Sequence, residues 1–120
     1  MLALIVEDEP HWSSILASIA KKLGLDATTA NNLSDAESLV TRGEFDVLLL
    51  DLHVEGPEGA SLLQIVESRE DLARKTILVT GFNLVGHALA TRVPVLCKTD
   101  LRELVPEIRR ITGLPPLEPS

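Results

Sequence analysis

The sequence predicts an α/β fold in which five parallel strands form a doubly wound sheet with helices on both faces. Short apolar runs alternate with segments of helical periodicity along the 120 residues. This alternation indicates right-handed strand–helix–strand crossovers and therefore a parallel sheet. The first run is almost continuously apolar, as expected for a strand covered on both faces. Polar or charged residues follow most of these runs, and in such a sheet they would gather beyond the carboxyl ends of the strands.

The first half of the chain predicts three strands and two helices. The strands are expected at Leu2–Val6, 25–30 and 45–50. The first helix begins at Pro10, which suits a first helical turn, and stops at Gly24. Its apolar face is formed by residues at helical spacing, namely Trp12, Leu16, Ile19 and Leu23. Asn32 or Ser34 can cap the second helix, which ends at Gly43.

The second half predicts two more strands, at 76–79 and 93–97, and three helices. The third helix follows a loop marked by Gly56 and Pro57. The fourth must fit within residues 82–92 and is expected to be short or irregular, because this segment contains Gly86. A last amphipathic helix is expected at 101–111. We therefore expect a domain at residues 1–112 and a flexible tail at 113–120.

Composition disfavours several classes of function. The formal net charge of −7 argues against direct nucleic-acid binding, which needs clustered lysine and arginine, and aromatic residues are only 2%. No apolar run approaches the roughly 20 residues of a membrane span, and the first residues lack the basic start of a signal peptide. These observations predict a soluble cytoplasmic protein. The lone Cys97 cannot form an internal disulfide and is expected to be a buried small residue.

Polar residues follow four of the five predicted strands. Glu7 and Asp8 follow the first strand, Asp51 the third, Thr80 the fourth and Lys98 the fifth. Three carboxylates brought together repel one another unless a cation compensates, and Mg²⁺ suits oxygen ligands beside phosphate. A carboxylate can attack phosphorus to give an aspartyl phosphate. A lysine ammonium and a threonine hydroxyl can then stabilise the transferring oxygens.

This set of residues resembles the receiver domain of bacterial response regulators, the CheY-like family. The matching motifs lie in the family's order along the chain: Glu7-Asp8, Asp51, Gly59, Thr80-Gly81 and Lys98. The resemblance covers nearly the whole chain, from Leu2 to about Ile111. The resemblance implies a flavodoxin-like fold with strand order 2-1-3-4-5. It also implies that Asp51 accepts a phosphoryl group from a histidine kinase or a histidine phosphotransfer protein.

The resemblance further implies a Mg²⁺ site and a function in two-component signal transduction. Asp8, Asp51 and the backbone carbonyl of His53 would hold the cation, with Glu7 acting largely through water. Thr80 and Lys98 would contact the phosphoryl group. The expected function is that of a phosphoryl-accepting receiver, and not of an enzyme acting on other substrates.

The chain also departs from the family pattern. Thr80 and Lys98 lie closer together in sequence than the family usually has them. Val95 stands where an output-switch aromatic is common, Thr99 follows Lys98 in place of proline, and Glu55 replaces a usual proline. These departures leave the phosphorylation chemistry intact but not the common output route. Output is therefore expected through contact with an unknown downstream protein or through phosphate relay, with reordering of Thr80 and residues 82–92.

Other residues near the predicted site suggest further hypotheses. The side chains of His53 and Phe82 could limit access of water to the phosphoryl group. Trp12 and Ile15 could belong to the core or to a kinase-docking face, because the first helix starts beside the acidic residues. His11 and His87 are treated as surface residues.

Three rival functions remain open at this level. The first is an adaptor that keeps the fold but works without phosphorylation, favoured by Val95. The second is a Mg²⁺-dependent phosphatase with an aspartyl nucleophile, disfavoured because His53 stands where its proton-transferring acid would be. The third is a flavin-binding module, disfavoured because no phosphate-cradling loop follows the first strand.

Overall fold

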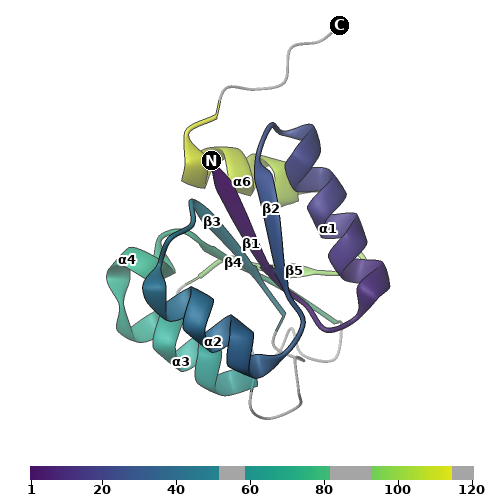
Figure 1. The fold of residues 1–120 in the computed structure, drawn as a ribbon. Coiled ribbons are helices and arrows are strands. Elements are labelled where there is room, and N and C mark those ends of the chain that lie inside the picture. Colours follow the sequence, from purple (N-terminus) through teal and green to yellow (C-terminus); the bar gives the residue numbers. More distant parts are fainter. Residues whose placement is uncertain (52–58, 82–92, 115–120) are drawn as a thin grey trace, which may run out of the picture.

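A five-stranded parallel sheet forms the centre of the computed structural model, which describes residues 1–51, 59–81 and 93–114 (Figure 1). The order is β2-β1-β3-β4-β5, and every neighbouring pair is parallel. The predicted doubly wound sheet and its strand order are therefore confirmed. The strands are β1 (Leu2–Val6), β2 (Asp26–Ala30), β3 (Val47–Leu50), β4 (Thr76–Thr80) and β5 (Val95–Cys97).

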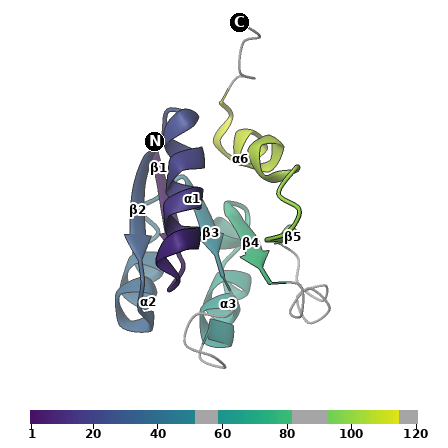
Figure 2. The ribbon, with the colours of Figure 1, turned by 90° about the vertical axis from the view of Figure 1, so that its right-hand side faces the viewer.

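Helices cover both faces of the sheet. One face packs against α1 (Pro10–Lys22) and α6 (Leu104–Thr112). The other face packs against α2 (Leu33–Arg42), α3 (Gly59–Ser68) and the short α4 (Glu70–Ala73), as two views at right angles show (Figures 1 and 2). The one-turn helix α4 was not predicted. The helix predicted within residues 82–92 lies outside the described residues.

Successive side chains of the inner strands pack alternately into two separate hydrophobic cores. In β1, Ala3 and Ile5 belong to the core under α1 and α6, whereas Leu4 and Val6 belong to the core under α2 and α3. The same alternation continues in β3 and β4, because successive side chains of a strand point to opposite faces. Burying each leucine- or isoleucine-sized side chain contributes roughly 1.5–3 kcal/mol. The inner strands are thus held on both sides, and their carboxyl ends are fixed.

Helix boundaries follow local capping. The Asn32 side chain accepts a hydrogen bond of 2.9 Å from the backbone N–H of Asp35, so Asn32 and not Ser34 caps α2. Such a cap contributes about 1 kcal/mol. Gly43 ends α2 with a left-handed φ of 66°, a backbone conformation that favours glycine. Pro10 is the first residue of α1, as predicted.

Several predicted elements start later than expected. Phe45 and Val93 are buried but precede β3 and β5, which begin at Val47 and Val95. Their apolar character reflects packing against the core and not strand pairing. The last helix begins at Leu104 and not at residue 101.

The described part of the chain ends with helix α6 and the two residues after it. Helix α6 ends at Thr112, and Gly113 follows in a left-handed conformation. Leu114 still packs against the core. Residues 115–120 lie outside the described part, and the limits of the domain stay a prediction. Across the three described ranges, none of the helices is long and apolar enough to cross a membrane.

Candidate functional site

The carboxyl ends of four neighbouring strands position the site. The hydrogen-bond ladder continues one residue past three of them. Asp51 N–H donates to the Val6 carbonyl at 3.0 Å, and Lys98 N–H donates to the Thr80 carbonyl at 2.8 Å. Glu7 N–H likewise donates to the carbonyl of Ala30 on β2 at 3.2 Å. These hydrogen bonds fix the backbone positions from which the side chains of Glu7, Asp51 and Lys98 extend. The prediction that these three residues gather at one edge of the sheet is confirmed.

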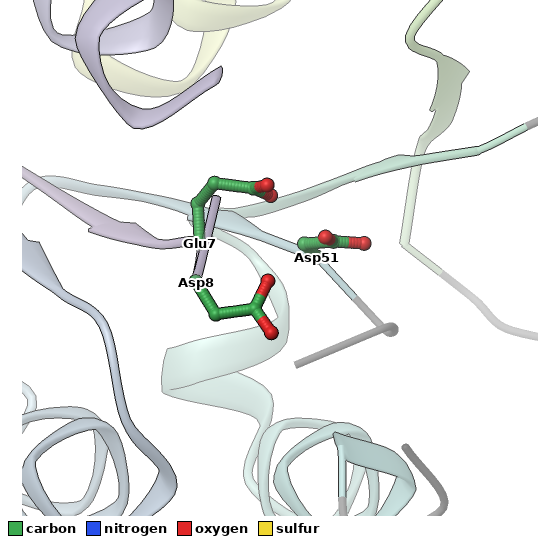
Figure 3. Close-up of side chains that lie close together, drawn as sticks. All are labelled: Glu7, Asp8 and Asp51. Carbon is green, nitrogen blue, oxygen red and sulfur yellow. The ribbon is translucent and has the colours of Figure 1, made fainter. Parts of the chain in front are cut away.

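Three carboxylates converge at this edge. Glu7 and Asp8 follow β1, Asp51 follows β3, and one oxygen of each lies within 4.8 Å of the others (Figure 3). Glu7 and Asp51 are only 1% and 2% exposed, whereas Asp8 is exposed. Carboxylate oxygens at this spacing form a donor set that could hold a hard divalent cation. The open side at Asp8 leaves room for further ligands.

Lys98 bridges the two buried carboxylates. Its Nζ lies 3.0 Å from Glu7 Oε1 and 3.1 Å from Asp51 Oδ2, and its side chain is 13% exposed. One ammonium thus faces two carboxylates, with Asp8 close by. Charge at the site remains net negative, which favours an added cation.

Burial and crowding shift the protonation equilibria of this pair. Burial, and then the neighbouring Asp51 carboxylate, raise the pKa of Glu7 to about 8, although Lys98 acts in the opposite direction. For Lys98, burial alone lowers the pKa. The hydrogen bonds to Glu7 and Asp51, together with the negative charge of these carboxylates, outweigh burial, so the pKa of Lys98 ends above its ordinary value. The lysine therefore stays charged at neutral pH.

We expect the metal-free protein to lose stability as the pH rises from about 5 to about 8. The pKa of Glu7 is raised from 4.5 to about 8 on folding, so in this range the folded state holds a proton that the unfolded chain has released. The free energy of unfolding then falls with pH by at most about 1.4 kcal/mol per unit. Urea unfolding in EDTA should show this slope, and Glu7→Gln should flatten it. Equal slopes in the two proteins would contradict the expectation.

Thr80 closes β4 beside Lys98 and carries a buried hydroxyl. Its side chain is fully buried, and Oγ1 has no hydrogen-bond partner among the described residues. Within the same part of the chain, Oε2 of Glu7 also lacks one. A buried polar atom without a partner costs about 1–3 kcal/mol and calls for an explanation. A ligand at the site that accepts from Thr80 would supply one.

A pair of valine substitutions separates the two buried threonines of β4. At the start of the strand, Thr76 Oγ1 donates to the Leu72 carbonyl at 2.7 Å. Thr76→Val should therefore lower the free energy of unfolding by about 1 kcal/mol, whereas Thr80→Val should leave it unchanged or raise it by about 1 kcal/mol. Denaturant unfolding measures both. A loss of stability in Thr80→Val equal to that in Thr76→Val would show that its hydroxyl is already satisfied.

An aromatic ring covers the lysine. The ring centroid of Trp12, in the first turn of α1, lies 5.3 Å from Lys98 Nζ. The sequence had suggested Trp12 only as a core or docking residue and missed this contact. The sequence feature that could have indicated this contact is Pro10, which directly follows the acidic residues and so starts the helix beside the site. Ile15 is half-buried and His11 is exposed.

Other predicted residues have different outcomes. His53, Glu55, Phe82 and His87 lie outside the described residues, and Gly59 is the first residue of α3. Val95 occupies β5 and is half-buried. The expectation that Cys97 is buried is wrong, because this short edge strand leaves it half-exposed, with Sγ 3.0 Å from Thr99 Oγ1.

Comparison with models of known protein families shows which family this chain belongs to. The family model described as the response regulator receiver domain matches residues 3–93. The chain belongs to this family. The receiver-domain match stops before Lys98, so the role of this lysine depends on the geometry given above. The predicted resemblance is confirmed.

Curated relatives of this receiver domain are response regulators. The response regulator protein PilR of Pseudomonas aeruginosa is 34% identical over 67 residues, which cover 56% of this chain and 15% of PilR. The sensory transduction protein RegX3 of Mycolicibacterium smegmatis is 30% identical over 113 residues, covering 90% of this chain and 49% of RegX3. The chain thus spans about half the length of these relatives or less.

A solved structure agrees with the receiver fold. The receiver domain of the sensor histidine kinase PA1611 from Pseudomonas aeruginosa superposes with a TM-score of 0.76 at 24% identity, covering 93% of this chain and 97% of that chain. That structure contains a magnesium ion coordinated in its active-site cleft. The likeness supports the fold of the present chain.

Proposed function

We propose that this receiver domain accepts a phosphoryl group on Asp51 in a two-component or phosphorelay pathway. The donor would be a histidine kinase or a histidine phosphotransfer protein. The observation that carries the proposal is Lys98, whose ammonium lies 3.0 and 3.1 Å from the buried carboxylates of Glu7 and Asp51. Family membership gives the same chemistry as its expectation.

Mg²⁺ is the cofactor that we propose for the acidic cluster. Asp8 and Asp51 would be direct ligands together with the backbone carbonyl of His53, and Glu7 would act largely through water. The spacing of the three carboxylates and their excess of negative charge support this assignment. The magnesium ion in the PA1611 receiver domain supports it by analogy. The bound ion would neutralise charge on the phosphoryl oxygens during transfer.

The chain's own residues would divide the remaining work. A carboxylate oxygen of Asp51 attacks phosphorus while the bond from phosphorus to the donor's leaving atom breaks. The ammonium of Lys98 then contacts a phosphoryl oxygen, which its position 3.1 Å from Asp51 Oδ2 allows. The hydroxyl of Thr80 would donate to another phosphoryl oxygen and so gain the partner that it lacks among the described residues.

The direct test is exposure of the purified protein to acetyl phosphate with and without Mg²⁺, followed by intact mass. We expect one phosphoryl adduct that requires Mg²⁺ and is removed by hydroxylamine, as an acyl phosphate is. A histidine kinase or histidine phosphotransfer protein that carries a phosphohistidine serves as the second donor. The absence of an adduct from both donors in the presence of Mg²⁺ would overturn the proposal.

A second candidate is a receiver-fold adaptor that acts without phosphorylation. Val95 favours it, because β5 lacks the aromatic through which the family commonly transmits its switch. The phosphorylated receiver would act by contact with a downstream protein or by phosphate relay, whereas the adaptor would act by protein contact alone. The adaptor predicts that Asp51→Ala preserves signalling in cells, whereas the phosphorylated receiver predicts its loss.

A further inference from the structure

The ring of Trp12 lies where it can control the lysine of the site. We propose that Trp12 is a positioning residue, which holds the Lys98 ammonium against Glu7 and Asp51 and limits its contact with water. This inference rests on the proposed phosphoryl transfer to Asp51. It assigns Trp12 a role within the site, distinct from docking of a kinase.

The fold brings the two residues together from opposite ends of the chain. Pro10 starts α1 directly after the acidic residues, so Trp12 falls in the first helical turn, at the carboxyl end of β1. Lys98 follows β5, at the same edge of the sheet. The distance of 5.3 Å from Nζ to the ring centroid lies within the range of about 6 Å for a cation–π interaction.

The chemistry of the contact suits a lysine that must remain charged. The ammonium has three donors on a flexible four-carbon stem, and two of them meet carboxylates at 3.0 and 3.1 Å. An aromatic face attracts the cation without carrying a charge of its own. A carboxylate in place of the Trp12 ring would also hold Lys98, but it would compete with the phosphoryl oxygens for the ammonium. The neutral ring holds the lysine and leaves its charge available.

The positioning role and the docking role predict different defects. A residue that only docks a kinase affects transfer from a histidine donor and leaves transfer from acetyl phosphate unchanged. A residue that positions Lys98 affects both donors. Acetyl phosphate is therefore the informative donor, because it has no protein surface to dock.

The experiment compares Trp12→Leu, which removes the aromatic face, with Trp12→Phe, which keeps one. Ser14→Ala, at an exposed position of α1, is the matched control. With saturating Mg²⁺, we expect Trp12→Leu to lower the maximal rate of phosphorylation by acetyl phosphate about 3- to 10-fold, with little change in KM. Trp12→Phe should recover most of this rate, and Ser14→Ala should match the wild type. Thermal unfolding of each variant controls for stability.

Two further measurements make the assignment specific. In the Lys98→Met background, Trp12→Leu should cause no additional loss of rate, because its effect passes through Lys98. Trp12 is the only tryptophan of the chain, so the emission spectrum of the folded protein should shift on Lys98→Met alone. That shift is expected whether or not a phosphoryl group is ever accepted.

Three results would overturn the inference. The first is a wild-type rate with acetyl phosphate in Trp12→Leu. The second is a rate in Trp12→Phe as low as in Trp12→Leu at equal stability. The third is an emission spectrum indifferent to Lys98→Met. A wild-type protein that accepts no phosphoryl group would instead refute the proposed function, and the emission test would still decide whether the ring contacts the lysine.

Discussion

Asp51→Asn is expected to abolish the phosphoryl adduct completely. The amide that replaces the carboxylate keeps the shape of the side chain but cannot form an acyl phosphate. The fold should persist, because the backbone N–H of Asp51 still donates to the Val6 carbonyl. Intact mass after treatment with acetyl phosphate and Mg²⁺ measures the loss, and circular dichroism checks the fold.

Asp46→Asn provides the matched control for this substitution. Asp46 is an exposed aspartate immediately before the same strand, at the opposite end from the site, where its Oδ2 accepts from the Leu2 N–H at 2.7 Å. It should lose a little stability and retain full phosphorylation. An adduct that survives in Asp51→Asn would place the acceptor on another residue and contradict the assignment.

Lys98→Ala is expected to have the second largest effect. Loss of a donor aimed at the transferring group typically slows such a reaction by about 100-fold or more. The same substitution leaves the buried carboxylates of Glu7 and Asp51 without their shared cation. Removing one partner of a buried pair destabilises by roughly 3 kcal/mol. We expect the loss of rate in the presence of Mg²⁺ and the loss of stability in the metal-free protein, where added Mg²⁺ should restore part of the stability.

Lys75→Ala separates the two effects. Lys75 precedes β4 at the other end of the sheet, where its Nζ donates to the carbonyls of Gly43 and Phe45 at 2.9 and 2.8 Å. Its loss should lower stability without slowing phosphorylation. Stopped-flow rates and urea unfolding on both variants test this. A Lys98→Ala protein that is phosphorylated as fast as Lys75→Ala would remove Lys98 from the chemistry.

Much of this fold could be predicted from periodicity alone. Each inner strand is an apolar run because both of its faces are covered, and β3 shows this with four fully buried residues. The polar residues that end these runs mark where each strand leaves the apolar core. Once the sheet is parallel, its topology brings Glu7, Asp51 and Lys98 to one edge, so the sequence alone predicts that they lie close together.

The burial of individual site residues and the contact between Trp12 and Lys98 could not be predicted from the sequence pattern. Sequence spacing could not show that Glu7 is buried and paired with Lys98 while Asp8 remains exposed, because this depends on how the strand ends turn. The position of Trp12 over Lys98 likewise depends on how the first turn of α1 is placed relative to the residue that follows β5. Strand starts were predicted too early because burial of Phe45 and Val93 imitates strand character.

The unpartnered oxygen atoms of Thr80 and Glu7 have a thermodynamic consequence. Neither atom has a hydrogen-bond partner among the described residues. A ligand that satisfies both atoms would bind the folded chain, and the unfolded chain offers no such site. By mass action, such a ligand at 100 times its dissociation constant adds about 2.7 kcal/mol to the stability of the domain. Binding of a ligand at the site should therefore also make the domain more rigid and lengthen its lifetime in the folded state. A loaded receiver should resist unfolding and proteolysis longer than an idle one.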